Sequence, residues 1–129
     1  MYFEYNITAF KHVPFGGDTG DGDIIREGVD WSAAAFTMAI APHEGDAASK
    51  TINSASAGSE GISATYDANY VNDEGTQVGA TTIRIYLLET SMETLGAGTF
   101  FYDLLVTPSG QAQRVLCRGS FTVLAGVAD

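Results

Sequence analysis

The chain has 129 residues, a mass of 13.6 kDa and 45% hydrophobic residues, which suffices for one domain with its own core. We therefore expect residues 1–129 to form a single domain. Six Lys and Arg residues stand against sixteen Asp and Glu residues, so the formal net charge is −10. Such a surface repels phosphate backbones and anionic lipid headgroups, and we expect neither a nucleic-acid nor a membrane partner. The single cysteine, Cys117, excludes an internal disulfide and a cysteine-built metal cluster.

No targeting or membrane-spanning segment is predicted. The N-terminal sequence MYFEY lacks the basic start and the apolar run of a signal peptide. The longest weakly polar stretch, residues 33–42, falls far short of the roughly 20 residues that a membrane helix needs. We expect a protein that is made and kept in a cytoplasm, or assembled there into something larger.

The first half of the chain predicts short strands and long connections. Apolar and polar residues alternate over residues 3–9 and again over residues 34–40, and a period of two is typical of a half-buried strand. Pro42 ends the second strand because it cannot donate to a ladder. Between these strands, residues 14–28 contain five glycines and four acids, which predicts an irregular segment outside the core.

The middle of the chain predicts three further strands and one helical turn. A short strand is expected near residues 51–52, a second over residues 62–66, and the clearest of all over residues 82–88. Residues 69–79 are polar and acidic, as in an exposed loop. Thr90 and Glu93 have the spacing of a helix capping box, so we expect a single helical turn near residues 91–95.

The last third predicts a hairpin. Both faces of residues 100–106 are largely apolar, which favours a strand in the middle of a sheet with packing on each side. A Thr-Pro-Ser-Gly turn follows, and the return strand over residues 113–124 contains Gly119, which suggests a β-bulge or a bend. The pattern as a whole predicts an all-β, immunoglobulin-like antiparallel β-sandwich of about seven or more strands, with that single helical turn.

The densest charge cluster is a candidate calcium loop. Asp18, Asp21 and Asp23 lie among glycines, and calcium prefers several oxygen ligands on a flexible loop. The EF-hand spacing fails because Gly20 stands at its third position and no glutamate closes the loop at its twelfth. The pattern favours a solvated loop over a metal site, and we expect no metal and no cofactor.

Catalytic motifs are not found in the sequence. His12 and His43, the only histidines, have no two-histidine metal spacing, and no Gly-x-Ser-x-Gly motif is present. Ser109 is explained by turn chemistry. Alternation places Cys117 inside, where it acts as a small hydrophobic residue rather than a reactive thiol. We therefore expect no catalytic residues and no enzymatic activity.

Two further groups of residues have a structural and a functional interpretation. Asp103 lies in an apolar strand, where an unpaired carboxylate is costly, so we expect it to pair with Arg114 or Arg118 on the next strand. Four aromatic residues could instead form a carbohydrate-stacking platform, although aromatic residues of a β-sandwich are more often core. They are Trp31, Tyr66, Tyr70 and Tyr86.

The C-terminal third contains Leu95-Gly96-Ala97-Gly98-Thr99-Phe100-Phe101-Tyr102-Asp103-Leu104, then Ser109-Gly110, then a strand that begins Arg114-Val115-Leu116 and continues as Arg118-Gly119-Ser120-Phe121-Thr122-Val123. In these residues lies a resemblance to a family of small tailed-bacteriophage structural proteins. It covers residues 81–127, and Phe100 stands where the family commonly has Tyr. The same segment is similar to the corner between two late strands of immunoglobulin-like domains, but Phe100 has no hydroxyl to close a tyrosine corner.

The resemblance implies a structural protein of the virion. We expect a non-enzymatic tail, neck or baseplate accessory subunit that is assembled in the host cytoplasm and acts through protein–protein contacts. Its partners would be copies of itself, in a homo-oligomer, or other phage structural proteins, with the acidic loops facing solvent or a basic partner. The alternative is a carbohydrate- or host-surface-binding module, assisted by calcium at the loop that contains Asp18, Asp21 and Asp23. A weaker third idea is a hydrolase with a carboxylate pair, for which no convergent motif is present.

Overall fold

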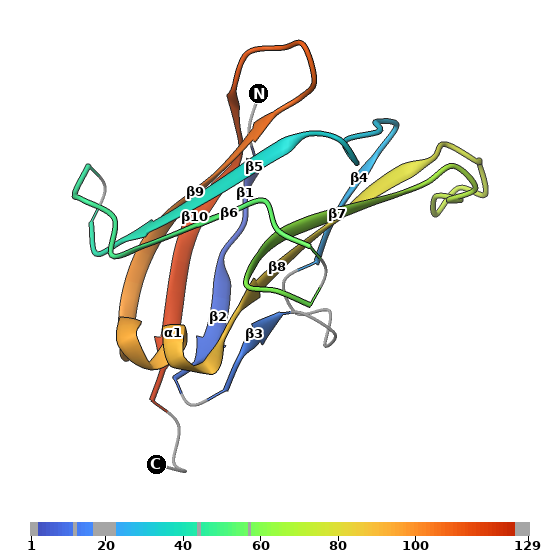
Figure 1. Ribbon diagram of the computed structural model, residues 1–129. Helices are drawn as coiled ribbons and strands as arrows, with labels where there is room; N and C mark the ends of the chain where they lie inside the picture. The colour runs from blue at the N-terminus through green and yellow to red at the C-terminus, as the bar shows by residue number, and fades with distance from the viewer. Residues whose placement is uncertain (1–2, 12, 17–22, 44, 57, 126–129) are drawn as a thin grey trace.

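The computed structural model describes the chain except for six short stretches. The described residues are 3–11, 13–16, 23–43, 45–56 and 58–125. They form two β-sheets and one short helix, so the predicted all-β sandwich is confirmed (Figure 1).

The larger sheet, here sheet A, has six strands. Its order is β1-β10-β9-β5-β6. The sixth strand, β2, follows β1 along the same edge of β10 and also pairs with β10. The pairs β10–β9, β9–β5 and β5–β6 are antiparallel, whereas β1 and β2 run parallel to β10. The strands are β1 (Phe3–Glu4), β2 (Ile7–Phe10), β5 (Ala35–Ala41), β6 (Lys50–Asn53), β9 (Gly98–Thr107) and β10 (Arg114–Leu124).

The smaller sheet, sheet B, has four strands around β8. Both β3 and β4 pair with one side of β8, and β7 pairs with its other side, all antiparallel. The helix α1 (Glu89–Leu95) connects β8 to β9 at one end of the sandwich (Figure 1). The strands are β3 (Phe15–Gly16), β4 (Asp23–Glu27), β7 (Gly61–Asp67) and β8 (Ala80–Leu87).

One hydrophobic core lies between the two sheets. Met38, Ile40 and Leu104 from sheet A and Ile83 and Ile85 from sheet B are fully buried. Since alternate residues of a strand point to opposite faces, each central strand gives one row of side chains to this core. Across the layers, the rings of Phe15 and Phe121 meet edge to face with centroids 5.6 Å apart.

The prediction for residues 14–28 is wrong. Within this range, β3 and β4 both pair with β8, and Phe15 and Ile24 are core residues. The glycines and acids dominate the composition of the segment, and they hide two short strands that each place one large apolar side chain inside.

The prediction for the start of the helix is also wrong in its detail. The helical turn exists as the seven residues of α1, but its N-cap is Leu88 and no side chain of that residue caps it. Instead, the carboxylate of Glu60, from the connection before β7, accepts hydrogen bonds from the Leu88 amide at 2.9 Å and from the Ser91 hydroxyl. The first amides of a helix have no partner within the helix, and a side chain from a distant segment can accept their hydrogen bonds as well as a neighbouring residue can.

Strand β9 is central, as predicted, but it is packed on one face only. Tyr102, Leu104 and Val106 face the core, while Phe101 on the other face is 39% exposed. The irregularity of β10 lies between Val115 and Cys117 and not at Gly119, which pairs regularly with Tyr102.

Candidate functional site

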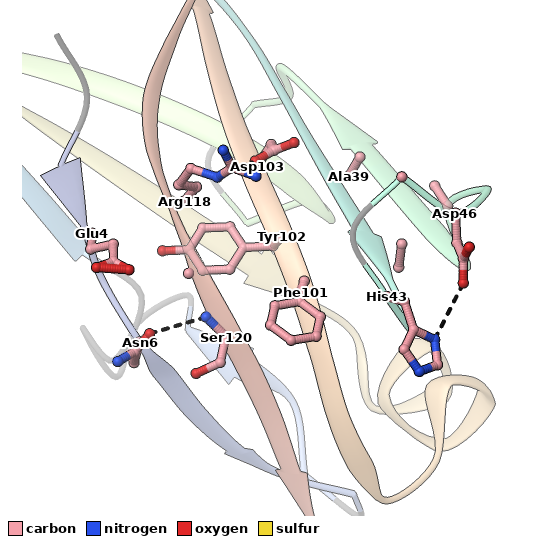
Figure 2. Close-up of a pocket in the computed structure, with 14 residues that line it drawn as sticks. Glu4, Asn6, Ala39, His43, Asp46, Phe101, Tyr102, Asp103, Arg118 and Ser120 are labelled. Carbon is pink, nitrogen blue, oxygen red and sulfur yellow. Dashed lines mark hydrogen bonds and ion pairs between the residues drawn. The ribbon is translucent and has the colours of Figure 1, made fainter.

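A groove of about 410 Å³ lies on the outer face of sheet A. Its floor is formed by side chains of β5, β9 and β10 that share this face because they are register neighbours. Ala39 lies opposite Asp103, Ala41 lies opposite Phe101, and Ser120 lies on the other side of Phe101. These short neighbours leave the Phe101 ring standing above the floor (Figure 2).

Two segments that are far apart in the sequence form the walls of the groove. On one side, the end of β1 supplies Glu4 and the link from β1 to β2 supplies Asn6. On the other side, the connection from β5 to β6 supplies His43 and Asp46 (Figure 2). The groove is thus a strip of sheet surface between two raised rims, open to solvent.

The charges of the groove are predominantly negative. Asp103 pairs with Arg118, with 3.3 Å between Oδ1 and Nε, and Asp46 lies 3.3 Å from His43 Nδ1. Both carboxylates keep about half of their side-chain surface exposed, 49% for Asp103 and 52% for Asp46. Three carboxylates, with Glu4 as the third, stand against one guanidinium and one imidazole.

The expected pairing of Asp103 is confirmed for Arg118. Arg114, the other expected partner, instead places its guanidinium 5.5 Å from the centre of the Trp31 ring, where Arg26 also lies at 5.7 Å. Such cation–π contacts are favourable because the face of an indole ring carries partial negative charge.

The rim next to β10 is held in place by backbone and side-chain hydrogen bonds. The Tyr5 amide donates to the Arg118 carbonyl at 3.0 Å, and the Ser120 amide donates to Asn6 Oδ1 at 3.0 Å. Between these two bonds, the Tyr102 hydroxyl donates to the Tyr5 carbonyl at 2.6 Å. The rim is therefore tied to both β9 and β10.

Gly119 makes this arrangement possible. A Cβ atom at this position would lie 2.3 Å from the Tyr5 carbonyl oxygen and 2.8 Å from Asn6 Oδ1. The glycine therefore has a packing role in place of the predicted bulge. An isolated glycine in a strand pattern is the sequence signal for such a close backbone approach, and here the approaching backbone lies more than a hundred residues earlier.

The only cysteine lies behind the groove, in the core. Cys117 is fully buried, and its sulfur is 3.7 Å from the Tyr102 hydroxyl. Burial raises the pKa of the thiol to about 11, although the contact with the Tyr102 hydroxyl lowers it in part. Burial likewise raises the pKa of Tyr102. Both groups are therefore neutral near pH 7, and the predicted role of Cys117 as a buried small hydrophobic residue is confirmed.

The candidate calcium loop lies mostly outside the described residues. Asp18 and Asp21 fall there, and so does His12. Asp23 belongs to β4, where its two oxygens accept hydrogen bonds of 3.1 and 3.2 Å from Arg84. Within the described part of the chain, no group of three or more His, Cys, Asp and Glu side chains is placed to hold a metal ion.

The four aromatic residues considered as a platform do not all lie on one exposed face. Trp31 is buried in the core, and its amide donates to the Thr81 hydroxyl at 2.9 Å. Tyr66 shares the inner face of sheet B with Thr81, whereas Tyr86 alternates with Ile85 and Leu87 and lies on the outer face. Tyr70 lies in the connection between β7 and β8.

Comparison of the chain with protein-family models, with curated proteins and with solved structures finds no match. No helix among the described residues is long and apolar enough to cross a membrane.

Proposed function

We propose that this chain is a non-enzymatic structural protein of a tailed-bacteriophage particle, in the tail, the neck or the baseplate. It acts through protein–protein contacts, and its contact surface is the outer face of sheet A. The observation that carries the proposal is the groove on that face, with an exposed Phe101 on its floor and charged side chains at its rims.

The composition of this face supports a protein partner. Interfaces combine a small number of aromatic or aliphatic anchors with a polar rim and a surface of small neighbours that a partner covers. Phe101 is such an anchor, and Ala39, Ala41 and Ser120 are the small neighbours. At the far end of the same face, the exposed side chains of Phe10 and Leu124 lie opposite each other in the β2–β10 register.

The family resemblance supports the same proposal independently. The residues that carry it span one continuous part of the fold, α1 followed by the β9–β10 hairpin. This hairpin supplies Phe101, Asp103 and Arg118 to the groove. The resembling residues therefore build part of the floor of the face to which we assign the contacts.

The proposal is tested by mass spectrometry of density-banded particles from a lysate of the source. We expect peptides of this chain to co-band with the particle, in a constant ratio to its other proteins across the gradient. A chain that stays at the top of the gradient while the particle bands below it would contradict a structural role. A high-salt wash of the particles before banding distinguishes two cases. A built-in subunit stays with the particle, whereas a protein that only adheres to the surface is released.

A further inference from the structure

We infer that the groove on the outer face of sheet A receives a basic segment of a different protein, a segment whose Arg or Lys side chain lies along Phe101. This inference rests on the proposed function and names the partner chemistry of the same site. It follows from three observations: the negative charge of the groove, the side chains of its floor, and the contacts that the chain's own Lys and Arg residues already make.

The charge of the groove selects a positive partner. Glu4 and Asp46 stand on opposite rims, and Asp103 lies on the floor between them (Figure 2). A cation that enters the groove is therefore flanked by carboxylates on both sides, and the net charge of −10 adds a long-range attraction. A negative partner would be repelled by the same groups.

The floor of the groove selects a long side chain with an apolar stem. Ala39 and Ala41 offer only methyl groups, and Phe101 offers an exposed ring. Arg and Lys bury their methylene stems on apolar surface and keep the charged head in water, and a guanidinium also stacks on an aromatic face. A bare metal cation or a small ammonium ion has no methylene stem to bury on this floor.

A second copy of the chain is a poor source of such a segment. The chain has only six Lys and Arg residues, and five of them already make a charge or ring contact within the same molecule. A second copy would also bring its own net charge of −10 toward the same negative groove. The five engaged cations are Arg26, Lys50, Arg84, Arg114 and Arg118.

The test is an NMR titration of the full ¹⁵N-labelled chain with a capped peptide, Ac-Ser-Ala-Arg-Ala-Arg-Ala-Ser-NH₂. The same peptide with Glu in place of Arg is the charge control. We expect the Arg peptide, but not the Glu peptide, to shift the amides of residues 39–41, 101–103 and 118–120. Since exposed charges are screened by salt, the affinity should fall several-fold between about 20 and 300 mM NaCl.

A matched pair of double variants separates the groove from the overall charge. Glu4→Gln with Asp46→Asn removes both rim charges, and we expect the affinity for the Arg peptide to fall about fivefold. Asp73→Asn with Glu74→Gln removes the same charge from the β7–β8 connection, which lies at the other end of the molecule, and should leave the affinity unchanged (Figure 1). Phe101→Ala should weaken binding about threefold.

Three results would overturn the inference: no groove shifts with the Arg peptide, equal shifts with the Glu peptide, or equal weakening in both double variants. None of these bears on whether the chain bands with the particle. Failure of the inference is therefore distinguishable from failure of the proposed function.

Discussion

A single tyrosine hydroxyl ties the N-terminal segment to the centre of sheet A. Tyr102 is 2% exposed, and its hydroxyl passes the bare Cα of Gly119 to reach the Tyr5 carbonyl at 2.6 Å. Phe100 has no hydroxyl and cannot make a tyrosine corner. The Tyr102 hydroxyl makes a bond of its own instead, and this bond holds the N-terminal segment at Tyr5. The groove rim that carries Glu4 thus depends on a core residue of β9.

Removal of this hydroxyl should be measurable in the stability of the chain. We expect Tyr102→Phe to lower the free energy of unfolding by about 1 kcal/mol, because the Tyr5 carbonyl loses its donor while the ring packing is kept. Urea unfolding followed by tryptophan fluorescence measures the change. Tyr86→Phe, on the outer face of sheet B, is the matched control and should change stability by less than about 0.5 kcal/mol. Equal effects of the two variants would contradict the role of the bond.

Cys117 should be inert until the sandwich opens. With a pKa of about 11, its thiol is ionised to roughly one part in a thousand at pH 8, and burial blocks reagents as well. We expect a disulfide reagent such as DTNB to label less than one equivalent over hours in buffer and a full equivalent within minutes in 6 M guanidinium. Rapid labelling of the folded chain would show that the thiol is accessible.

At the scale of elements, α1 depends on a residue outside it. Glu60 caps the Leu88 amide through Oε2, and its Oε1 lies 2.8 Å from Lys50 Nζ. Desolvation raises the pKa of Glu60, but the bonds from Lys50, Ser91 and Leu88 outweigh this effect, and the pKa lies below the ordinary value of 4.5. One carboxylate thus joins β6, the β6–β7 connection and the helix.

Because the pKa of Glu60 is lowered, its contribution to the free energy of unfolding should decrease as the pH falls. A carboxyl group with a lowered folded-state pKa stabilises the fold above its unfolded pKa, and this contribution is lost as the pH falls through the folded value. We expect Glu60→Ala to cost about 2 kcal/mol at pH 7. The difference from the unaltered chain should persist to about pH 5 and shrink below pH 4. Unfolding curves over this pH range test it, with Glu74→Ala as an exposed control.

The elements show which parts of the fold the sequence could predict. Strands with a clean period of two, such as β5 and β8, were predicted within two residues of their observed bounds, because one buried face imposes that period. β3 and β4 were missed because each offers one core side chain within a glycine-rich and acidic context. The helix start was misassigned because its cap, Glu60, comes from another segment, which no local pattern reveals.

The groove was hidden from the sequence for a related reason. Its rims come from residues near 5 and near 45, and its floor comes from residues near 40, 102 and 119. Only the register of β5, β9 and β10 brings these residues onto one face. Asp103 and its Arg118 partner were predicted because they lie on two strands of one hairpin, whereas Glu4, Asp46 and Phe101 had no local signal.

At the scale of the whole molecule, β9 should be the most protected strand. It is hydrogen-bonded to β10 on one side and to β5 on the other, and its inner side chains are buried. We expect the amides of residues 100–106 to be among the slowest to exchange with deuterium, and those of β4, at an edge of sheet B, to exchange sooner. Fast exchange throughout residues 100–106 would contradict the central position of β9.

At the scale of the whole molecule, we propose that the outer face of sheet A makes the protein contacts, and hydroxyl-radical footprinting tests this proposal most directly. The free chain and the banded particle are labelled in parallel, and oxidation is read by mass spectrometry at Phe101 and His43 of the groove and at Tyr86 of the opposite sheet. We predict that oxidation of Phe101 and His43 falls at least fivefold in the particle while that of Tyr86 changes little. Equal oxidation of Phe101 in the two samples, or protection of Tyr86 alone, would contradict the account.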